Sequence, residues 1–183
     1  MPVENRLANR RGGSKNVGVT FEIRRVGYDH PDAQALVAEV QQMYAERYGS
    51  IDTDPTDPVM FVPPAGAFFV GYLGGVPAAT GGWRASDERL PGASRVAEIK
   101  RMYVVARHQR RGLARRMLAH LEADARATGI DGLILSTGQR QPEAIALYLS
   151  SGYCEIAPFG YYADEELVRC FGKRLGAPAP SSL

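Results

Sequence analysis

The fold of this chain is decided by residues 98–117, which read EIKRMYVVARHQRRGLARRM. The stretch begins as a strand, turns at the basic segment 109–114 and continues with the apolar spacing of a helix. The first turn of a helix offers unused backbone N–H groups and the positive end of the helix dipole. A strand that enters a helix through such a turn is suited to bind phosphate. Further positive charge at this turn comes from Arg110, Arg111, Arg115 and Arg116.

The composition is that of one globular domain of ordinary size. Hydrophobic residues make up 45% and charged residues 23% of 183 residues, close to the average for soluble proteins. No apolar run approaches the about 20 residues that a membrane helix needs. The N-terminus carries no apolar signal core, so we expect a cytoplasmic protein without membrane contact. We expect a disordered basic tail at 1–18, a folded domain at 19–175 and a short tail at 176–183.

Charge and metal-ligating residues exclude several function classes. Four basic residues against Glu4 give residues 1–20 a charge of +3, and the formal total is +2. The rest of the chain is therefore nearly neutral, which argues against a nucleic-acid surface over the domain. Two cysteines make no disulfide framework or zinc spacing. The three histidines are scattered, so we expect no metal site.

The first half of the chain is expected to form a strand, a helix and a hairpin. Asp29 could cap the helix, Pro31 suits its first turn, and Gly49 would end it. A proline-rich segment at 50–66 predicts a loop with a short helical turn at most. The predicted elements are a strand at 20–26, a helix from about 31 to 47, and strands at 67–72 and 76–84.

The second half alternates strands and helices. The predicted elements are a strand at 95–105, a helix from 113 that Gly129 ends, a strand at 133–136, a helix at 142–150, and strands at 153–158 and 166–175. The strands at 95–105 and 133–136 flank one helix, so they should be parallel. This order predicts an α/β (α+β) fold, a single mixed sheet of about six to seven strands flanked by helices. Glu98 and Lys100 place charge on one face of a central strand, which suggests that this face lines a cleft.

The basic turn differs from two common phosphate-binding motifs. No Gly-Lys-Ser/Thr follows it, as a nucleoside-triphosphate loop requires. It carries one glycine, Gly112, whereas a dinucleotide fingerprint needs three spaced glycines after a strand. The small residue Ala114 two positions later lets the backbone close on a diphosphate.

The residues of this turn and of two neighbouring segments resemble the GNAT superfamily of acyl-CoA-dependent N-acyltransferases. Residues 109–114 (QRRGLA) fit the signature Gln/Arg-x-x-Gly-x-Gly/Ala of that superfamily. The strand at 97–104 (AEIKRMYV) looks like the fourth strand of its members. Residues 144–148 (AIALY) and 151–153 (SGY) resemble their later helix and its end. The order of elements is similar from residue 20 to 175.

The resemblance implies a donor, acetyl-CoA, and the groups that bind it. The pyrophosphate would lie on the backbone amides of 109–114, with Arg110, Arg111 and Arg115 as charged contacts. Pantetheine would pair with the fourth strand, which would splay from the next strand and offer an N–H near Tyr103 or Val104 to the thioester carbonyl. The implied CoA-binding residues are Met102, Tyr103, Val104, Gln109, Arg110, Arg111, Gly112, Leu113, Ala114 and Arg115.

Two residues are candidates for proton transfer. Glu98 matches the position of the general base in several members, and a carboxylate there could take a proton from the amine directly or through water. It could instead pair with Lys100 or Arg101 on a solvated strand edge. Tyr148 resembles the tyrosine that protonates the departing CoA thiolate, and a phenol of pKa about 10 is protonated at neutral pH. It could instead be an aromatic residue that fills the core.

The sequence departs from the family at the start of the later helix. Many members carry an asparagine there, whereas residues 139–143 read QRQPE. Gln139 or Gln141 could substitute, and neither is assigned. Direct transfer needs no covalent intermediate, so Cys154 and Cys170 are expected to pack inside rather than act as nucleophiles.

The acceptor is left open by the sequence. It should be bound by residues 29–66, Trp83 and the loop at 159–165. Three aspartates at 52, 54 and 57 could attract a cationic amine, although aspartates beside prolines usually form turns. The functional hypotheses are an N-acetyltransferase that acts on a primary amine of a small molecule or protein, and a non-catalytic acyl-CoA sensor. Nucleic-acid binding has support only from the basic tail, and a homodimer stays open.

Overall fold

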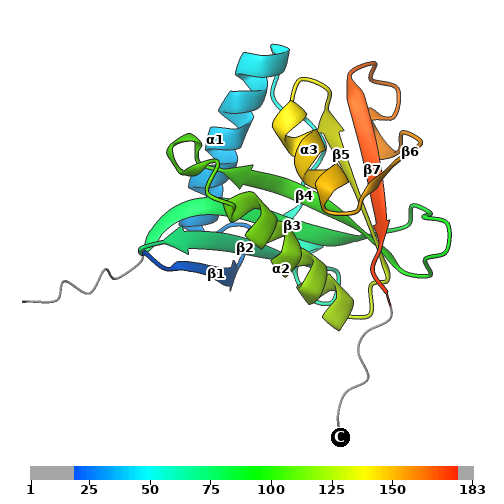
Figure 1. Cartoon of the computed structure of the whole chain (residues 1–183), viewed down its shortest axis with the longest axis horizontal. Helices are drawn as coiled ribbons and strands as arrows, with labels where there is room; N and C mark the ends of the chain where they lie inside the picture. The colour runs from blue at the N-terminus through cyan, green and yellow to red at the C-terminus, as the bar shows by residue number, and fades with distance from the viewer. Residues whose placement is uncertain (1–18, 177–183) are drawn as a thin grey trace, which may run out of the picture.

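The computed structural model describes residues 19–176, which form one mixed sheet with helices on both faces (Figure 1). The tail expected at 1–18 and all but the first residue of the tail expected at 176–183 lie outside the described residues. The helices are α1 (Pro31–Tyr48), α2 (Leu113–Ala127) and α3 (Pro142–Ser150). The strands are β1 (Phe21–Val26), β2 (Gly66–Leu73), β3 (Val76–Ser86), β4 (Val96–Val104), β5 (Gly132–Gly138), β6 (Cys154–Ile156) and β7 (Val168–Arg174).

The sheet has the order β1-β2-β3-β4-β5-β7-β6. The predicted mixed fold is confirmed, and so is the parallel pairing of β4 with β5 across α2. Every other neighbouring pair is antiparallel, as hairpins allow. The last strand, β7, inserts between β5 and β6, so β5 is held along its whole length on that side.

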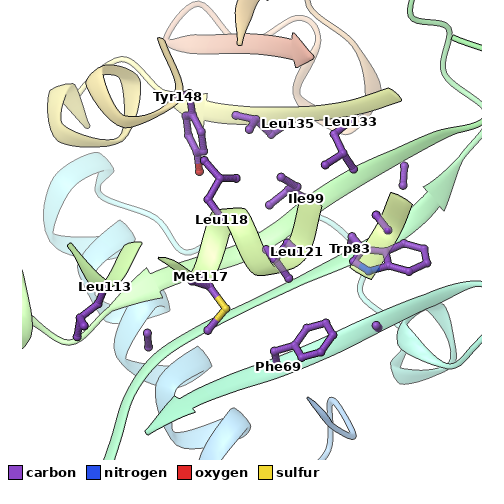
Figure 2. Packing of buried hydrophobic residues seen from close by; sticks show 14 of the residues in the cluster. Phe69, Trp83, Ile99, Leu113, Met117, Leu118, Leu121, Leu133, Leu135 and Tyr148 are labelled. Atoms are coloured by element: carbon purple, nitrogen blue, oxygen red, sulfur yellow. The ribbon is translucent and has the colours of Figure 1, made fainter. Parts of the chain in front are cut away.

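Two hydrophobic clusters fix the helices to opposite faces of the sheet. The apolar stripe of α2, with Met117, Leu118 and Leu121, packs on Phe69 and Trp83 (Figure 2). All three stripe residues are at most 1% exposed, and each buried side chain of this size stabilises the fold by about 1.5–3 kcal/mol. On the other face, α1 packs Ala33, Leu36 and Val37 against Phe68 and Val70 of β2 in a separate cluster.

The start of α1 differs from the prediction in one detail. His30, rather than Asp29, occupies the cap position, and its Nδ1 accepts from the N–H of Asp32 at 3.2 Å. The end agrees with the prediction, because Gly49 has a φ of 81°, in the left-handed region that favours glycine. The proline-rich segment contains the expected short turn, a 3₁₀ helix at Pro58–Phe61.

The central feature of the sheet is the divergence of β4 from β5. The two strands pair only over Val96, Ala97 and Glu98. Strand β4 continues to Val104 beside β3, while β5 continues beside β7. A β-bulge lies just beyond the separation, because the register to β3 shifts between Thr80 and Gly82 and Arg101 has a φ of 55°. The edge of β4 that faces β5 is therefore unpaired beyond Glu98.

Candidate active site

The basic turn leads directly from β4 into α2. Gly112 is the N-cap residue, with a φ of 76° and no side-chain cap bond. A Cβ added there would meet nothing within 4 Å, so the backbone conformation and not the space favours glycine. The first intrahelical bond runs from the N–H of Arg116 to the carbonyl of Gly112 at 3.1 Å. The N–H groups of Leu113, Ala114 and Arg115 precede it and have no partner within the helix.

The side chains of this turn have different environments. Arg110 and Arg111 are exposed, and Arg110 also has a positive φ of 60°. Leu113 is 4% exposed and packs in the core, so it can offer a ligand only its backbone. Arg115 is directed to the end of α3, where it donates to the Oγ of Ser150 at 2.7 Å and of Ser151 at 3.1 Å. In this conformation the Arg115 guanidinium joins α2 to α3.

The unpaired edge of β4 presents the peptide group of Val104. The N–H of Val105 donates to the carbonyl of Ala78 on the β3 side at 2.9 Å. Peptide groups of successive strand residues point to opposite edges. The N–H of Val104 therefore points away from β3, and its carbonyl accepts from Nε2 of Gln109 at 3.1 Å. Gln109 thus ties the basic turn to the end of β4.

Two further residues predicted from this strand are partly buried, Met102 and Tyr103. The Tyr103 hydroxyl donates to Oε2 of Glu39 at 3.3 Å, which connects β4 to α1. Burial raises the pKa of Tyr103, and the neighbouring Glu39 carboxylate raises it further.

Tyr148 projects from α3 into the core beside α2. Its ring lies 5.8 Å from that of Tyr153 and 6.1 Å from that of Phe171, measured between centroids. Figure 2 shows its hydroxyl directed toward Leu118 of α2. Burial is the main cause that raises the pKa of Tyr148, with a smaller contribution from Tyr44. The hydroxyl therefore holds its proton at neutral pH.

Glu98 lies on the opposite face of the sheet, in a cluster of buried charges. Its Oε2 accepts from Nε and Nη2 of Arg84 at 3.0 and 2.8 Å, and its Oε1 accepts from Nζ of Lys100 at 3.2 Å. Both cations also reach Oδ2 of Asp54, Lys100 at 2.5 Å and Arg84 at 3.2 Å. We call Asp54, Arg84, Glu98 and Lys100 the buried ion cluster. Pairing with Lys100 was one of the two expectations for Glu98, but the site is buried rather than solvated.

The aspartates of the loop after α1 are all used within the fold. Asp52 pairs with Arg101 and accepts from the Tyr162 hydroxyl at 2.6 Å. Asp54 belongs to the buried ion cluster. Asp57 caps the 3₁₀ turn by accepting from the N–H of Val59 at 2.9 Å. The turn-forming role therefore holds for Asp57, and the other two carboxylates are already paired with cations.

Two expectations about other side chains are wrong. Trp83 was expected near the acceptor, but it is 1% exposed on the α2 face and donates its indole N–H to Asp124 at 2.8 Å. Cys154 was expected to be buried and is exposed, whereas Cys170 is buried as expected.

The amide of Gln141 approaches the Tyr48 hydroxyl at 3.4 Å, so Gln141 contacts α1 in this structure.

A pocket of about 300 Å³ opens beside Glu98. Arg84 and Glu98 line it together, since they are directly paired in the register of β3 and β4. Sequence reasoning missed Arg84, although the antiparallel register would have placed it opposite Glu98. The remaining lining comes from Met60, Ala65, residues 85–88, Phe159 and Gly160. A larger hollow of about 790 Å³ follows residues 85–96 and shares part of this lining.

The described residues, 19–176, offer neither a membrane-spanning helix nor a cluster of metal ligands. No helix among them has the length and apolar character needed to cross a membrane. Within the same residues, no group of three or more His, Cys, Asp or Glu side chains is arranged to hold a metal ion.

Comparisons with known proteins identify relatives of this fold. The model of the acetyltransferase (GNAT) family matches residues 37–153. An IAA acetyltransferase from Azospirillum brasilense is 40% identical over 70 residues, which are 38% of this chain and 46% of that protein. A solved Klebsiella pneumoniae protein assigned to the acyl-CoA N-acyltransferases has a TM-score of 0.69 and 26% identity, over 85% of this chain and 97% of its own. A solved IAA acetyltransferase from Bacillus cereus has a TM-score of 0.58 and 18% identity, over 85% and 100% of the two chains.

Proposed function

The chain belongs to the GNAT acetyltransferase family, and we propose that its domain at 19–175 transfers an acetyl group from acetyl-CoA directly to a primary amine. One observation supports this most. The pairing of β4 with β5 stops at Glu98, so an unpaired strand edge runs toward the uncapped start of α2. An extended thioester arm could pair with that edge while its pyrophosphate lies on the helix start.

In this proposal each part of acetyl-CoA, the acetyl donor, has a defined place. The pyrophosphate lies on the basic turn of 109–114, where the N–H groups of Leu113 and Ala114 have no partner within the helix, with charge from Arg110 and Arg111. The N–H of Val104 donates to the thioester carbonyl and stabilises the oxyanion that develops there. Arg115 contributes its backbone, since its side chain is occupied at the end of α3.

The chemistry needs one proton removed and one supplied. The acceptor nitrogen attacks the thioester carbon, and its surplus proton passes to Glu98 directly or through water. The carbon–sulfur bond then breaks, and Tyr148 protonates the CoA thiolate. Burial raises the pKa of Tyr148, so the phenol is protonated at neutral pH, but it is also a weaker acid than an exposed tyrosine.

The alternative, a non-catalytic acyl-CoA sensor, is favoured by the environment of Glu98. Two cations already neutralise this carboxylate, and a base must exchange a proton with substrate. A turnover screen separates the two functions. Thiol release from acetyl-CoA would be followed with amino acids, polyamines, aminoglycosides, peptides, and IAA, which two relatives are named for. Thiol release that depends on one class of amine supports the enzyme. Tight binding of acetyl-CoA without thiol release in the presence of any acceptor supports the sensor.

A further inference from the structure

The pocket beside Glu98 places a carboxylate and a guanidinium side by side. Glu98 and Arg84 are partners in the β3–β4 register and both line the pocket. Its apolar lining comes from Met60, Ala65 and Phe159. A volume of about 300 Å³ is at the small end for ligand pockets, so it suits a small acceptor.

Arg84 retains hydrogen-bond donors that the fold does not use fully. A guanidinium has five N–H groups. The Nε and Nη2 groups of Arg84 donate to Glu98 and Asp54. Nη1 has the Met60 sulfur as its partner at 3.2 Å, and a thioether is a weak acceptor. Nη1 is therefore suited to donate to an oxygen of a bound molecule.

Lys100 cannot serve in this way. Its ammonium is directed to Asp54 and Glu98, and its side chain is 7% exposed against 19% for Arg84. Arg84 is therefore the cation of the buried ion cluster that reaches the pocket.

The charge balance of the cluster selects among acceptors. Its two carboxylates and two cations cancel, so a bound molecule with only an ammonium group would add unpaired positive charge beside Arg84. A molecule that carries both a carboxylate and an amine matches the pocket, with the carboxylate at Arg84 and the amine at Glu98. Asp87 and Glu88 also line the pocket, but they are exposed, so their charges act in a higher effective dielectric and more weakly than the part-buried Arg84.

We infer that the acceptor is a small amino carboxylate, such as an amino acid, and that Arg84 binds its carboxylate. This inference rests on the proposed function. The carboxylate takes no part in the reaction: the acceptor nitrogen bonds to the acetyl carbon, the carbon–sulfur bond breaks, and the sulfur leaves as the CoA thiol. Arg84 is a specificity-determining residue, because it aligns the amine with Glu98 by holding the other end of the molecule.

A panel of matched acceptors tests the inference. Each amino acid is compared with its amide and its decarboxylated amine, for example valine, valinamide and isobutylamine. Values of kcat/KM are expressed per unprotonated amine, because the three amines differ in pKa. We expect a loss of about tenfold or more on removing the carboxylate, with the amide in between, because a charged acceptor bonds a guanidinium more strongly. An amine without a carboxylate that reacts equally well or better overturns the inference, and an amide equal to the acid identifies a peptide carbonyl as the group bound, which overturns it too.

The variant Arg84→Lys separates carboxylate binding from support of Glu98. It keeps a positive charge but loses the planar fork. We expect the ratio of kcat/KM for valine over isobutylamine to fall toward one. If Arg84 only positioned Glu98, both acceptors would slow equally and the ratio would stay unchanged, which overturns the inference. Calorimetric binding of acetyl-CoA checks the fold of the variant, and Arg24→Lys, at an exposed pair with Glu22, is the matched control. If acetyl-CoA released no thiol with any amine acceptor, the proposed function itself would be refuted, independently of Arg84.

Discussion

Replacing Lys100 by methionine tests how much the buried ion cluster contributes to the stability of the fold. The Lys100 ammonium lies 2.5 Å from Asp54 and 3.2 Å from Glu98, and its side chain is 7% exposed. Its removal leaves two buried carboxylates to share Arg84. Removing one partner of a buried ion pair costs about 3–5 kcal/mol of stability. We expect a loss near the lower end of this range, because Arg84 still pairs with both carboxylates. We therefore expect the free energy of unfolding to fall by about 3 kcal/mol, or Tm by roughly 6–12 °C for a chain of this size.

The assay is urea denaturation of the wild-type protein, Lys100→Met, Asp54→Asn and the double variant. The double variant removes one charge of each sign, so its loss should be smaller than the sum of the single losses by about 1 kcal/mol or more. The matched control is Lys173→Met, which breaks a less buried pair with Glu122 at 2.8 Å and should cost about 1 kcal/mol. Equal losses for the two lysine variants, or strict additivity in the double variant, would refute this account of the cluster. An unchanged m-value would show that only stability has changed.

Three further predictions concern the donor side and the proton transfers. Tyr148→Phe should lower kcat by about 100-fold or more and leave the Kd for acetyl-CoA unchanged; equal turnover would remove the hydroxyl from the mechanism. Because burial raises the pKa of Tyr148, it stays protonated as pH rises, and any basic limb of the wild-type profile below about pH 10 should persist in Tyr148→Phe. Glu98→Gln should abolish the acidic limb of the pH–rate profile, and an unchanged limb would count against the base role. Joint replacement of Arg110 and Arg111 by alanine should weaken acetyl-CoA binding and reduce its dependence on salt, measured by calorimetry with Arg24→Ala as control; an affinity equal to the control would exclude the two arginines as phosphate contacts.

The features that local sequence determines were predictable. The stripe of α2 and its glycine-marked ends follow from spacing along one segment, and so does the parallel pairing of β4 with β5, since a single helix connects them. The turn of residues 109–114 is likewise local, so its uncapped helix start could be anticipated. The side-chain contacts of this turn could not be predicted, because Arg115 donates hydrogen bonds to Ser150 and Ser151, which lie more than 30 residues later.

The acceptor side depends on contacts between distant segments. Lys100 meets Asp54 across 46 residues, and the Tyr162 hydroxyl meets Asp52 across 110. The sequence could not show which cations the aspartates of this loop pair with, because an aspartate that forms a turn and one that forms an ion pair look the same in a sequence. The pairing of Arg84 with Glu98 spans only 14 residues. It required the hairpin register, which a strand prediction does not contain.

Arg101 lies between the unpaired edge of β4, proposed to bind acetyl-CoA, and the loop that supplies Asp54 to the buried ion cluster. Its φ of 55° lies in a region that costs a non-glycine residue about 1–2 kcal/mol, and it lies in the bulge just beyond the point where β4 leaves β5. Glycine would relieve the backbone, yet the arginine side chain is 3% exposed, pairs with Asp52 and donates to Thr56 at 3.0 Å. The same residue therefore forms the bulge beside the unpaired edge of β4 and anchors the loop that supplies Asp54. Because one position serves both, the edge of β4 proposed for the thioester and the pocket proposed for the amine, on the Glu98 face of β4, are held in a fixed relation.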